Sequence, residues 1–203
     1  MVCGEDFESL RSSGQLEKLS FRDKVYIALQ LCSAVSRMHG FGIIHQNVCS
    51  DTIIIDKKTL TLTMIGFRNA APIEDASARR GIGSLPYIAP EAVFDNGITS
   101  FKEDIWSVGM VLATLFTGLA PYQSELDESR LHDLHEANEN LPRYRQKPSA
   151  NVDMKLFTEQ GKMMEQVGTL INLSVCPTPC LRLSAKELLG AFAMLMTMDT
   201  EVV

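Results

Sequence analysis

The chain has 203 residues, 45% of them apolar and 22% charged, which is typical of one globular unit that buries its own core. Its net charge of −6 and its lack of a lysine- or arginine-rich cluster disfavour a nucleic-acid ligand, because neutralising phosphates requires a basic face. No stretch approaches the ~20 consecutive apolar residues of a membrane span, so we expect no membrane anchoring.

The first predicted helix spans residues 21–39, where apolar side chains recur at helical spacing among charged ones. Glycines at 40 and 42 are expected to end it. The β-branched run at 52–55 predicts a short strand, and residues 60–65 alternate between apolar and polar side chains. With a turn at 56–58, these two segments predict a small β-hairpin.

Residues 66–91 show no sustained period and include several glycines and prolines, which predicts a long loop. From about 102 to 117 the chain is apolar on nearly every side, which is typical of a buried central helix. Gly118 and Pro121 follow in the order expected at a helix end.

The rest of the chain predicts an exposed helix at 126–137, a surface loop at 138–153 and two further helices at 158–173 and 184–196. The last helix opens on Ser184 and Glu187, the spacing of a capping box. The fold class expected is mainly α (α+β), with one minor sheet. We expect residues 1–203 to form a single domain.

Four sequence motifs resemble those of the C-terminal lobe of eukaryotic protein kinases, from about residue 1 to about 195. They are the run at 38–47, Ala-Pro-Glu at 89–91, the segment at 104–109 with Trp106, and the segment at 182–189. The resemblance implies a C-lobe-like helical domain in which 66–91 corresponds to the activation segment. It also implies that the N-lobe is absent, because residues 1–6 resemble the hinge.

Structural positions of the family are retained in this resemblance. It implies that His45 packs beneath Phe67 and hydrogen-bonds to the backbone. Asp104 is expected to accept backbone amides of the loop that contains His45. Glu91 and Arg182 are expected to form a structural ion pair.

The catalytic positions are changed. Aligned with the family, Asn47 replaces the base Asp, Cys49 the nearby Lys, Thr52 the magnesium-binding Asn and Gly66 the Asp of Asp-Phe-Gly. An amide cannot act as a base, and two oxygen ligands for metal are lost. Gln46 replaces the arginine that binds a phosphorylated activation loop. We therefore expect a chain that is not an enzyme, with no metal and no cofactor.

The leading hypothesis is a pseudokinase that acts as a protein-binding scaffold or as a structural component of a complex. Without an N-lobe, an apolar surface is expected to be uncovered and then covered by a protein partner or a second copy. Its expected residues are Ile53, Ile54, Ile55, Met64 and Phe67. The alternative is a divergent Ser/Thr protein kinase or ATP-binding protein completed by an N-lobe from another chain, and a fragment of a longer protein also stays open.

The five scattered cysteines favour reduced thiols, and no secretory signal pattern is evident. We therefore expect a cytoplasmic protein, with association with the cytoskeleton or a complex left open. Cys176 and Cys180 lack further ligands at zinc spacing. His132 and His135, three residues apart, likewise predict surface polar groups and not a metal site.

Overall fold

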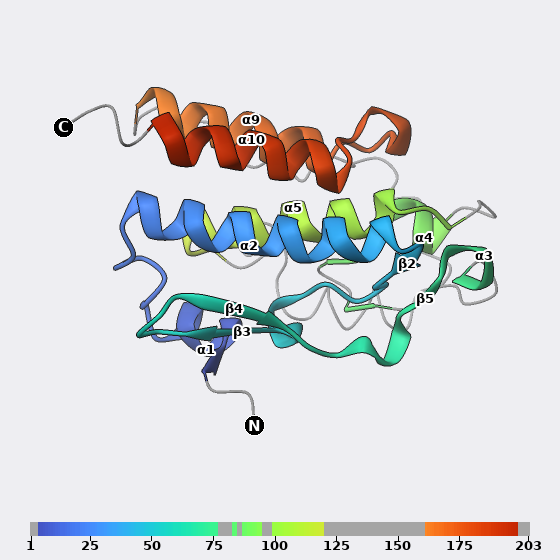
Figure 1. The fold of residues 1–203 in the computed structure, drawn as a ribbon, viewed down its shortest axis with the longest axis horizontal. Helices are drawn as coiled ribbons and strands as arrows, with labels where there is room; N and C mark the ends of the chain where they lie inside the picture. The colour runs from blue at the N-terminus through green and yellow to red at the C-terminus, as the bar shows by residue number, and fades with distance from the viewer. Residues whose placement is uncertain (1–3, 77–82, 85–86, 95–98, 120–160, 199–203) are drawn as a thin grey trace.

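A computed structural model describes residues 4–76, 83–84, 87–94, 99–119 and 161–198. Its four long helices stack in two pairs above a small sheet (Figure 1). Helix α10 (Ala185–Met198) packs on α2 (Phe21–Gly40), and α9 (Lys162–Ser174) packs on α5 (Lys102–Thr117). The expectation of a mainly α fold with a small hairpin is confirmed. None of these described helices is both long and apolar enough to cross a bilayer.

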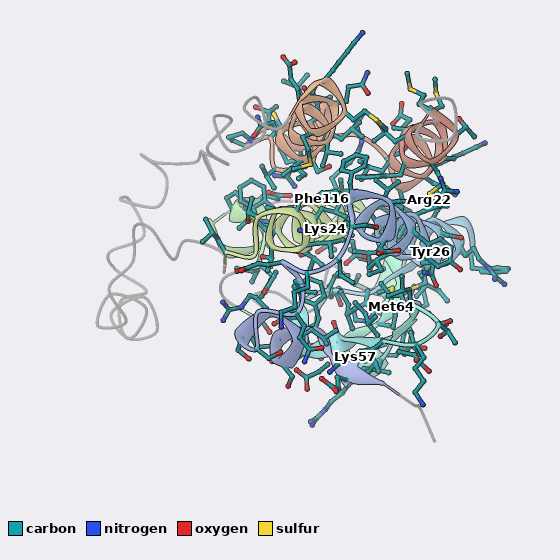
Figure 2. All side chains as sticks on the ribbon, turned by 90° about the vertical axis from the view of Figure 1, so that its left-hand side faces the viewer. Arg22, Lys24, Tyr26, Lys57, Met64 and Phe116 are labelled. Atoms are coloured by element: carbon teal, nitrogen blue, oxygen red, sulfur yellow. The ribbon has the colours of Figure 1, made fainter. Side chains whose placement is uncertain are left out.

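Helix α2 begins at a capping box. Ser20 Oγ accepts the backbone N–H of Asp23 at 3.1 Å, and Asp23 accepts the backbone N–H of Ser20 at 3.2 Å. The predicted range 21–39 differs from the observed helix by one residue. At its solvent-facing edge, Lys24 Nζ donates to the Phe116 carbonyl at 3.2 Å and so joins α2 to the end of α5 (Figure 2).

Helix α5 is the centre of the core, as predicted. Nearly all of its side chains are buried, including Trp106 and Leu112. It ends at Gly118, whose left-handed φ of 75° lets its N–H donate to the Thr114 carbonyl at 2.8 Å. A helix this apolar can form only where other elements cover every face, so its position organises the rest of the domain.

The predicted hairpin consists of β3 (Ile53–Asp56) and β4 (Thr61–Met64), paired antiparallel with Ile53 opposite Met64. A third strand, β1 (Glu5–Asp6), pairs with β3 and was not predicted. It leads into α1 (Phe7–Ser12), which packs beneath β3. Residues 5–12 therefore cover one edge and one face of the hairpin.

The loop expected at 66–91 contains short elements, so the expectation that it has none is wrong. Strand β5 (Ala71–Pro72) pairs antiparallel with β2 (Ile43–Ile44), and α3 (Ile73–Ala76) follows it. A 3₁₀ turn at Phe67–Asn69 precedes them, and α4 (Pro90–Phe94) begins within Ala-Pro-Glu. The elements are too short to give a periodic sequence signal. The helix expected at 126–137 and the loop expected at 138–153 lie outside the described residues.

Helices α9 and α10 agree with the helices predicted at 158–173 and 184–196, although residues 158–160 lie outside the described residues. The capping box of α10 is confirmed, since Ser184 Oγ accepts the Glu187 N–H at 3.2 Å and Glu187 accepts the Ser184 N–H at 2.7 Å. Helix α9 approaches α5 closely at Gly109, where an added Cβ would lie 2.8 Å from Ser174 Cβ. A small residue is therefore required at this crossing.

We predict that Gly109→Ala destabilises the fold by about 1–3 kcal/mol, because the methyl group overpacks the α5–α9 contact. Gly190→Ala is the matched control, since a Cβ there meets no atom within 4 Å. That change should stabilise α10 by about 0.5–1 kcal/mol through helix propensity. Equilibrium urea unfolding measures both, and equal effects of the two changes would contradict the close packing.

Candidate functional site

The loop after β2 is fixed by Asp104, a carboxylate only 1% exposed in the first turn of α5. Its Oδ2 accepts the backbone N–H of His45 at 2.8 Å, and its Oδ1 accepts that of Gln46 at 2.9 Å. His39 Nε2, from the end of α2, lies 2.9 Å from Oδ2. The loop and the end of α2 thus converge on one buried charge of α5, and Asp104 accepts the loop amides as expected.

His45 is held as a neutral ring. The Asn47 backbone N–H donates to His45 Nδ1 at 3.3 Å, so Nδ1 carries the lone pair and Nε2 carries the proton. Nε2 donates to the Ile65 carbonyl at 3.1 Å, and the ring meets Phe67 edge-on at 5.1 Å. Burial lowers the pKa of His45, although the Asp104 charge acts in the opposite direction. The expected contacts of His45 with Phe67 and with the backbone are thus observed.

Asn47 lies against the segment that precedes α4. Ser84 Oγ donates to Asn47 Oδ1 at 3.3 Å and lies 3.4 Å from Cys49 Sγ. Asn47 is half-buried, whereas Cys49 is buried. An asparagine carboxamide at the tip of this loop therefore contacts an aliphatic hydroxyl group.

Thr52 and Gly66 do not fit a magnesium site. Thr52 Oγ1 accepts the Cys49 N–H at 3.0 Å and lies 3.0 Å from the Asn47 and Cys49 carbonyls, so it is used within the loop. Gly66 offers no side-chain oxygen, and a Cβ there would lie 2.6 Å from Thr52 Cγ2. Magnesium prefers oxygen ligands in octahedral geometry. Among the described residues, no group of three His, Cys, Asp or Glu side chains could hold a metal ion.

The predicted ion pair between Glu91 and Arg182 is confirmed. Arg182 Nη2 donates to Glu91 Oε2 at 2.7 Å, and Nη1 contacts the other carboxylate oxygen. The Arg182 side chain is fully buried, and its Cζ lies 5.0 Å from the Trp106 ring centre. This cation therefore joins α4 to α5 and to the turn before α10.

The expected apolar surface is wrong for three of its five residues. Ile53, Ile55 and Met64 are buried, because alternate residues of the hairpin face the core and α1 packs beneath β3. Ile54 is half-buried, and Phe67 is 52% exposed. Only Phe67 is left as an exposed large apolar side chain of the predicted set.

Sequence reasoning missed three features of this site. The contact of His39 with Asp104 was not expected. Gln46 adopts a left-handed φ of 63° and buries its side chain. Glu103, beside Asp104, was not singled out, although an acidic residue at the start of so apolar a helix was a usable signal.

Among the described residues, Glu103 is the carboxyl group whose pKa is raised most. Burial raises its pKa to about 7, and the nearby carboxylates of Glu91 and Asp104 add to the increase. The Ser100 backbone N–H, which Glu103 Oε1 accepts at 3.3 Å, lowers its pKa, as does Arg182. Glu103 therefore titrates near neutral pH.

Comparison with known proteins identifies similar chains. A model described as "Protein kinase domain" matches residues 1–192. The probable serine/threonine-protein kinase HSL1 of Saccharomyces cerevisiae is 30% identical over 60% of this chain and 8% of its own length. The serine/threonine-protein kinase polo of Drosophila melanogaster is 27% identical over 72% and 26%. Testis-specific serine/threonine-protein kinase 5 of Mus musculus is 30% identical over 46% and 26%. The chain thus spans about a quarter or less of each relative.

These matches confirm the resemblance to protein kinases and correct one expectation drawn from it. The expectation that the chain is not an enzyme is wrong, because the protein kinase domain match and the Ser/Thr kinase relatives point to a kinase. The family pattern extends over nearly the whole chain, whereas the substitutions lie only at a few positions in and after the catalytic loop.

We predict that Glu103→Gln raises Tm more at pH 8 than at pH 5. The pKa of Glu103 is raised on folding, so the stability linked to this group is fully present below about pH 4.5 and is lost as pH rises through about 7. A neutral Gln side chain removes this loss of stability. The loss is on the order of 1 kcal/mol at pH 8 when the weakening of the pKa shift by solvent screening is taken into account.

Thermal unfolding at the two pH values measures this effect. Glu165→Gln, an exposed position on α9, is the matched control and should change Tm equally at both. A pH-independent effect of Glu103→Gln would show that its carboxyl group titrates normally.

Proposed function

Because this chain belongs to the protein kinase family, we propose that it is the polypeptide-binding lobe of a divergent serine/threonine protein kinase. In this proposal the upper lobe is supplied by another part of the same polypeptide or by a separate chain. The lobe described here then positions the acceptor hydroxyl of a substrate polypeptide.

The observation that carries the proposal is the contact between Asn47 Oδ1 and Ser84 Oγ at 3.3 Å. This contact supports a role in which the Asn47 carboxamide, at the position of the family's base, accepts a hydrogen bond from an aliphatic hydroxyl group. A serine or threonine of a bound polypeptide offers the same donor. The rigid attachment of the loop to Asp104 keeps Asn47 in place without the substrate.

Positioning is a large part of what this family of reactions requires. Phosphoryl transfer passes through a loose transition state in most analyses, so orientation and electrostatic stabilisation supply most of the acceleration. Asn47 cannot remove the hydroxyl proton, so as the new P–O bond forms and ADP leaves, the proton passes to the transferred phosphoryl oxygens or to water. Asn47 can hold the hydroxyl oxygen in line. We assign no step to magnesium, because Thr52 and Gly66 do not fit its coordination.

We further propose that the upper lobe covers Phe67. This ring packs edge-on against His45 on one side, yet it is 52% exposed. Half-buried Ile54 on β3 is the other residue of the expected surface with accessible area. Burial of Phe67 would connect the upper lobe to the loop that contains Asn47.

A protein-binding scaffold role is the second candidate, and it can accompany kinase activity. The observation that favours it is the internal use of the Thr52 hydroxyl, which ties the loop to its own backbone. A scaffold needs the same rigid lobe and polypeptide-binding surface but depends less on the hydroxyl contact of Asn47.

We predict that this chain, combined with an upper kinase lobe, transfers phosphate from ATP to a serine-containing peptide. Asn47→Ala should slow the transfer about 10-fold or more, since a positioning hydrogen bond is lost. Asn172→Ala on α9 is the matched control and should have no effect. Radiolabelled phosphate incorporation and peptide affinity are measured on the same samples.

No transfer, or transfer that Asn47→Ala leaves unchanged, would contradict the role of Asn47. Retained peptide affinity in that case would favour the scaffold role. Loss of both would reject polypeptide binding by this lobe.

A further inference from the structure

Two hollows meet on the face of the molecule where α2 begins, which is the face toward the viewer in Figure 2. The first holds about 250 Å³ between the end of α1 and the hairpin, and its walls include Leu16 and Leu60. The second holds about 480 Å³ between the starts of α2 and α9 and the end of α5, and its walls include Phe21 and Phe116. Leu19 lines both hollows, so together they form one groove, the α2 groove.

Apolar side chains that keep accessible area line the α2 groove. Leu19, Phe21, Leu60 and Met163 are half-buried. The rings of Phe21 and Phe116 are tilted in the wall of the larger hollow, with their centroids 6.1 Å apart. Covering apolar area is favourable by about 25 cal/mol per Å². Each hollow therefore suits an apolar side chain of a ligand.

The charge around the α2 groove is positive, although the chain as a whole has a net charge of −6. Among the described lining residues there is one acid, Glu17, and there are four lysines. Lys18 and Lys57 line the smaller hollow, and Lys24 and Lys162 line the larger one. Figure 2 labels Lys24 and, below it, Lys57. The groove is thus complementary in charge to an acidic ligand.

Two of these lysines are free to pair with a ligand. Lys24 Nζ donates to a carbonyl of α5, and Lys57 pairs with Glu5 at 2.6 Å, so both are used within the fold. Lys18 and Lys162 are exposed, and their ammonium groups form no hydrogen bond or ion pair with a described residue. One of them lies in each hollow, so a ligand that spans the groove meets both.

The backbone groups in the wall of the smaller hollow are already paired. The Leu16 N–H donates to the Leu10 carbonyl at 3.3 Å, and the Leu60 N–H donates to the Asp56 carbonyl at 2.7 Å. The Leu60 carbonyl accepts Gln30 Nε2 at 2.8 Å. An entering strand would find no main-chain partner among these groups. A helix satisfies its own backbone and presents only side chains to a groove.

We propose that the α2 groove binds an acidic amphipathic helix of a partner protein. Apolar side chains of that helix enter the two hollows on either side of Leu19, and its carboxylates pair with Lys18 and Lys162. The site goes beyond the proposed function, because the groove lies at the start of α2 and the loop with Asn47 follows the end of α2. The length of this helix separates the two by roughly 30 Å.

Other anionic ligands fit the α2 groove less well. A nucleic acid requires an extended basic face, whereas the floor of this groove is apolar. An anionic membrane surface takes up apolar side chains that protrude, whereas those of the groove line a hollow. A helix with an apolar stripe and acidic flanks suits both the shape and the charge.

The probe for this site is a fluorescein-labelled helical peptide of about 15 residues. Its leucines recur at every third or fourth residue between glutamates, and it contains no serine or threonine. A matched peptide carries lysine in place of every glutamate. Fluorescence anisotropy at low salt should show binding of the acidic peptide and about 10-fold or more weaker binding of the basic one. Added salt should weaken binding of the acidic peptide.

Lys18→Glu and Lys162→Glu should each weaken the acidic peptide about 5-fold, because each change replaces an attraction with a repulsion. Lys186→Glu is the matched control, since it makes the same change of charge at an exposed position on α10 and should leave the affinity unchanged. All three lysines are exposed, so the variants should keep the Tm of the unaltered chain.

Equal binding of the two peptides, or no effect of either groove variant, would overturn the proposal. Vesicles of phosphatidylserine and phosphatidylcholine should not sediment the chain. Sedimentation that Lys18→Glu abolishes would overturn it as well, because the groove would then be a membrane contact. The peptides contain no hydroxyl acceptor, so these outcomes are independent of phosphate transfer.

Discussion

The carboxylate of Asp104 is the interaction on which the site depends. It is buried at the start of α5, which has the largest buried share of the long helices among the described residues, and an isolated charge there would be strongly unfavourable. The charge is stable there because two backbone N–H groups of the His45 loop and the ring of His39 surround it. The same contacts fix the loop, so one buried charge connects the core to the site.

The loop conformation follows from this attachment. Gln46 adopts a left-handed backbone, which is unusual for a residue with a side chain, and the two N–H groups that bind Asp104 hold it there. His45 and Asn47 then contact different segments: His45 contacts Ile65 and Phe67, and Asn47 contacts Ser84. The ion pair between Glu91 and Arg182 likewise holds the segment after Ser84 in place, because Arg182 also donates to the Lys102 carbonyl at the start of α5.

The amino-acid sequence predicts the parts of this fold that depend on local pattern. The range 102–117 is apolar on nearly every side and is followed by a glycine, and the observed helix has the predicted bounds. The ion pair and the roles of His45 and Asp104 were available from the family resemblance. The burial of the hairpin could not be predicted in the same way, because three consecutive isoleucines at 53–55 give no alternation that would show which side chains face the core. That depends on β1 and α1, which lie more than 40 residues earlier in the chain.

The contacts of His39 with Asp104 and of Ser84 with Asn47 could not be predicted from the sequence either, because they join residues that are far apart in the chain. Hydrogen exchange at the His45 and Gln46 amides tests the central claim most directly, that Asp104 holds the loop rigid before any ligand binds. The account predicts exchange as slow as that of the amides in the middle of α5, and much faster exchange at these two amides alone in Asp104→Asn. Rapid exchange at His45 and Gln46 in the unaltered protein would contradict it.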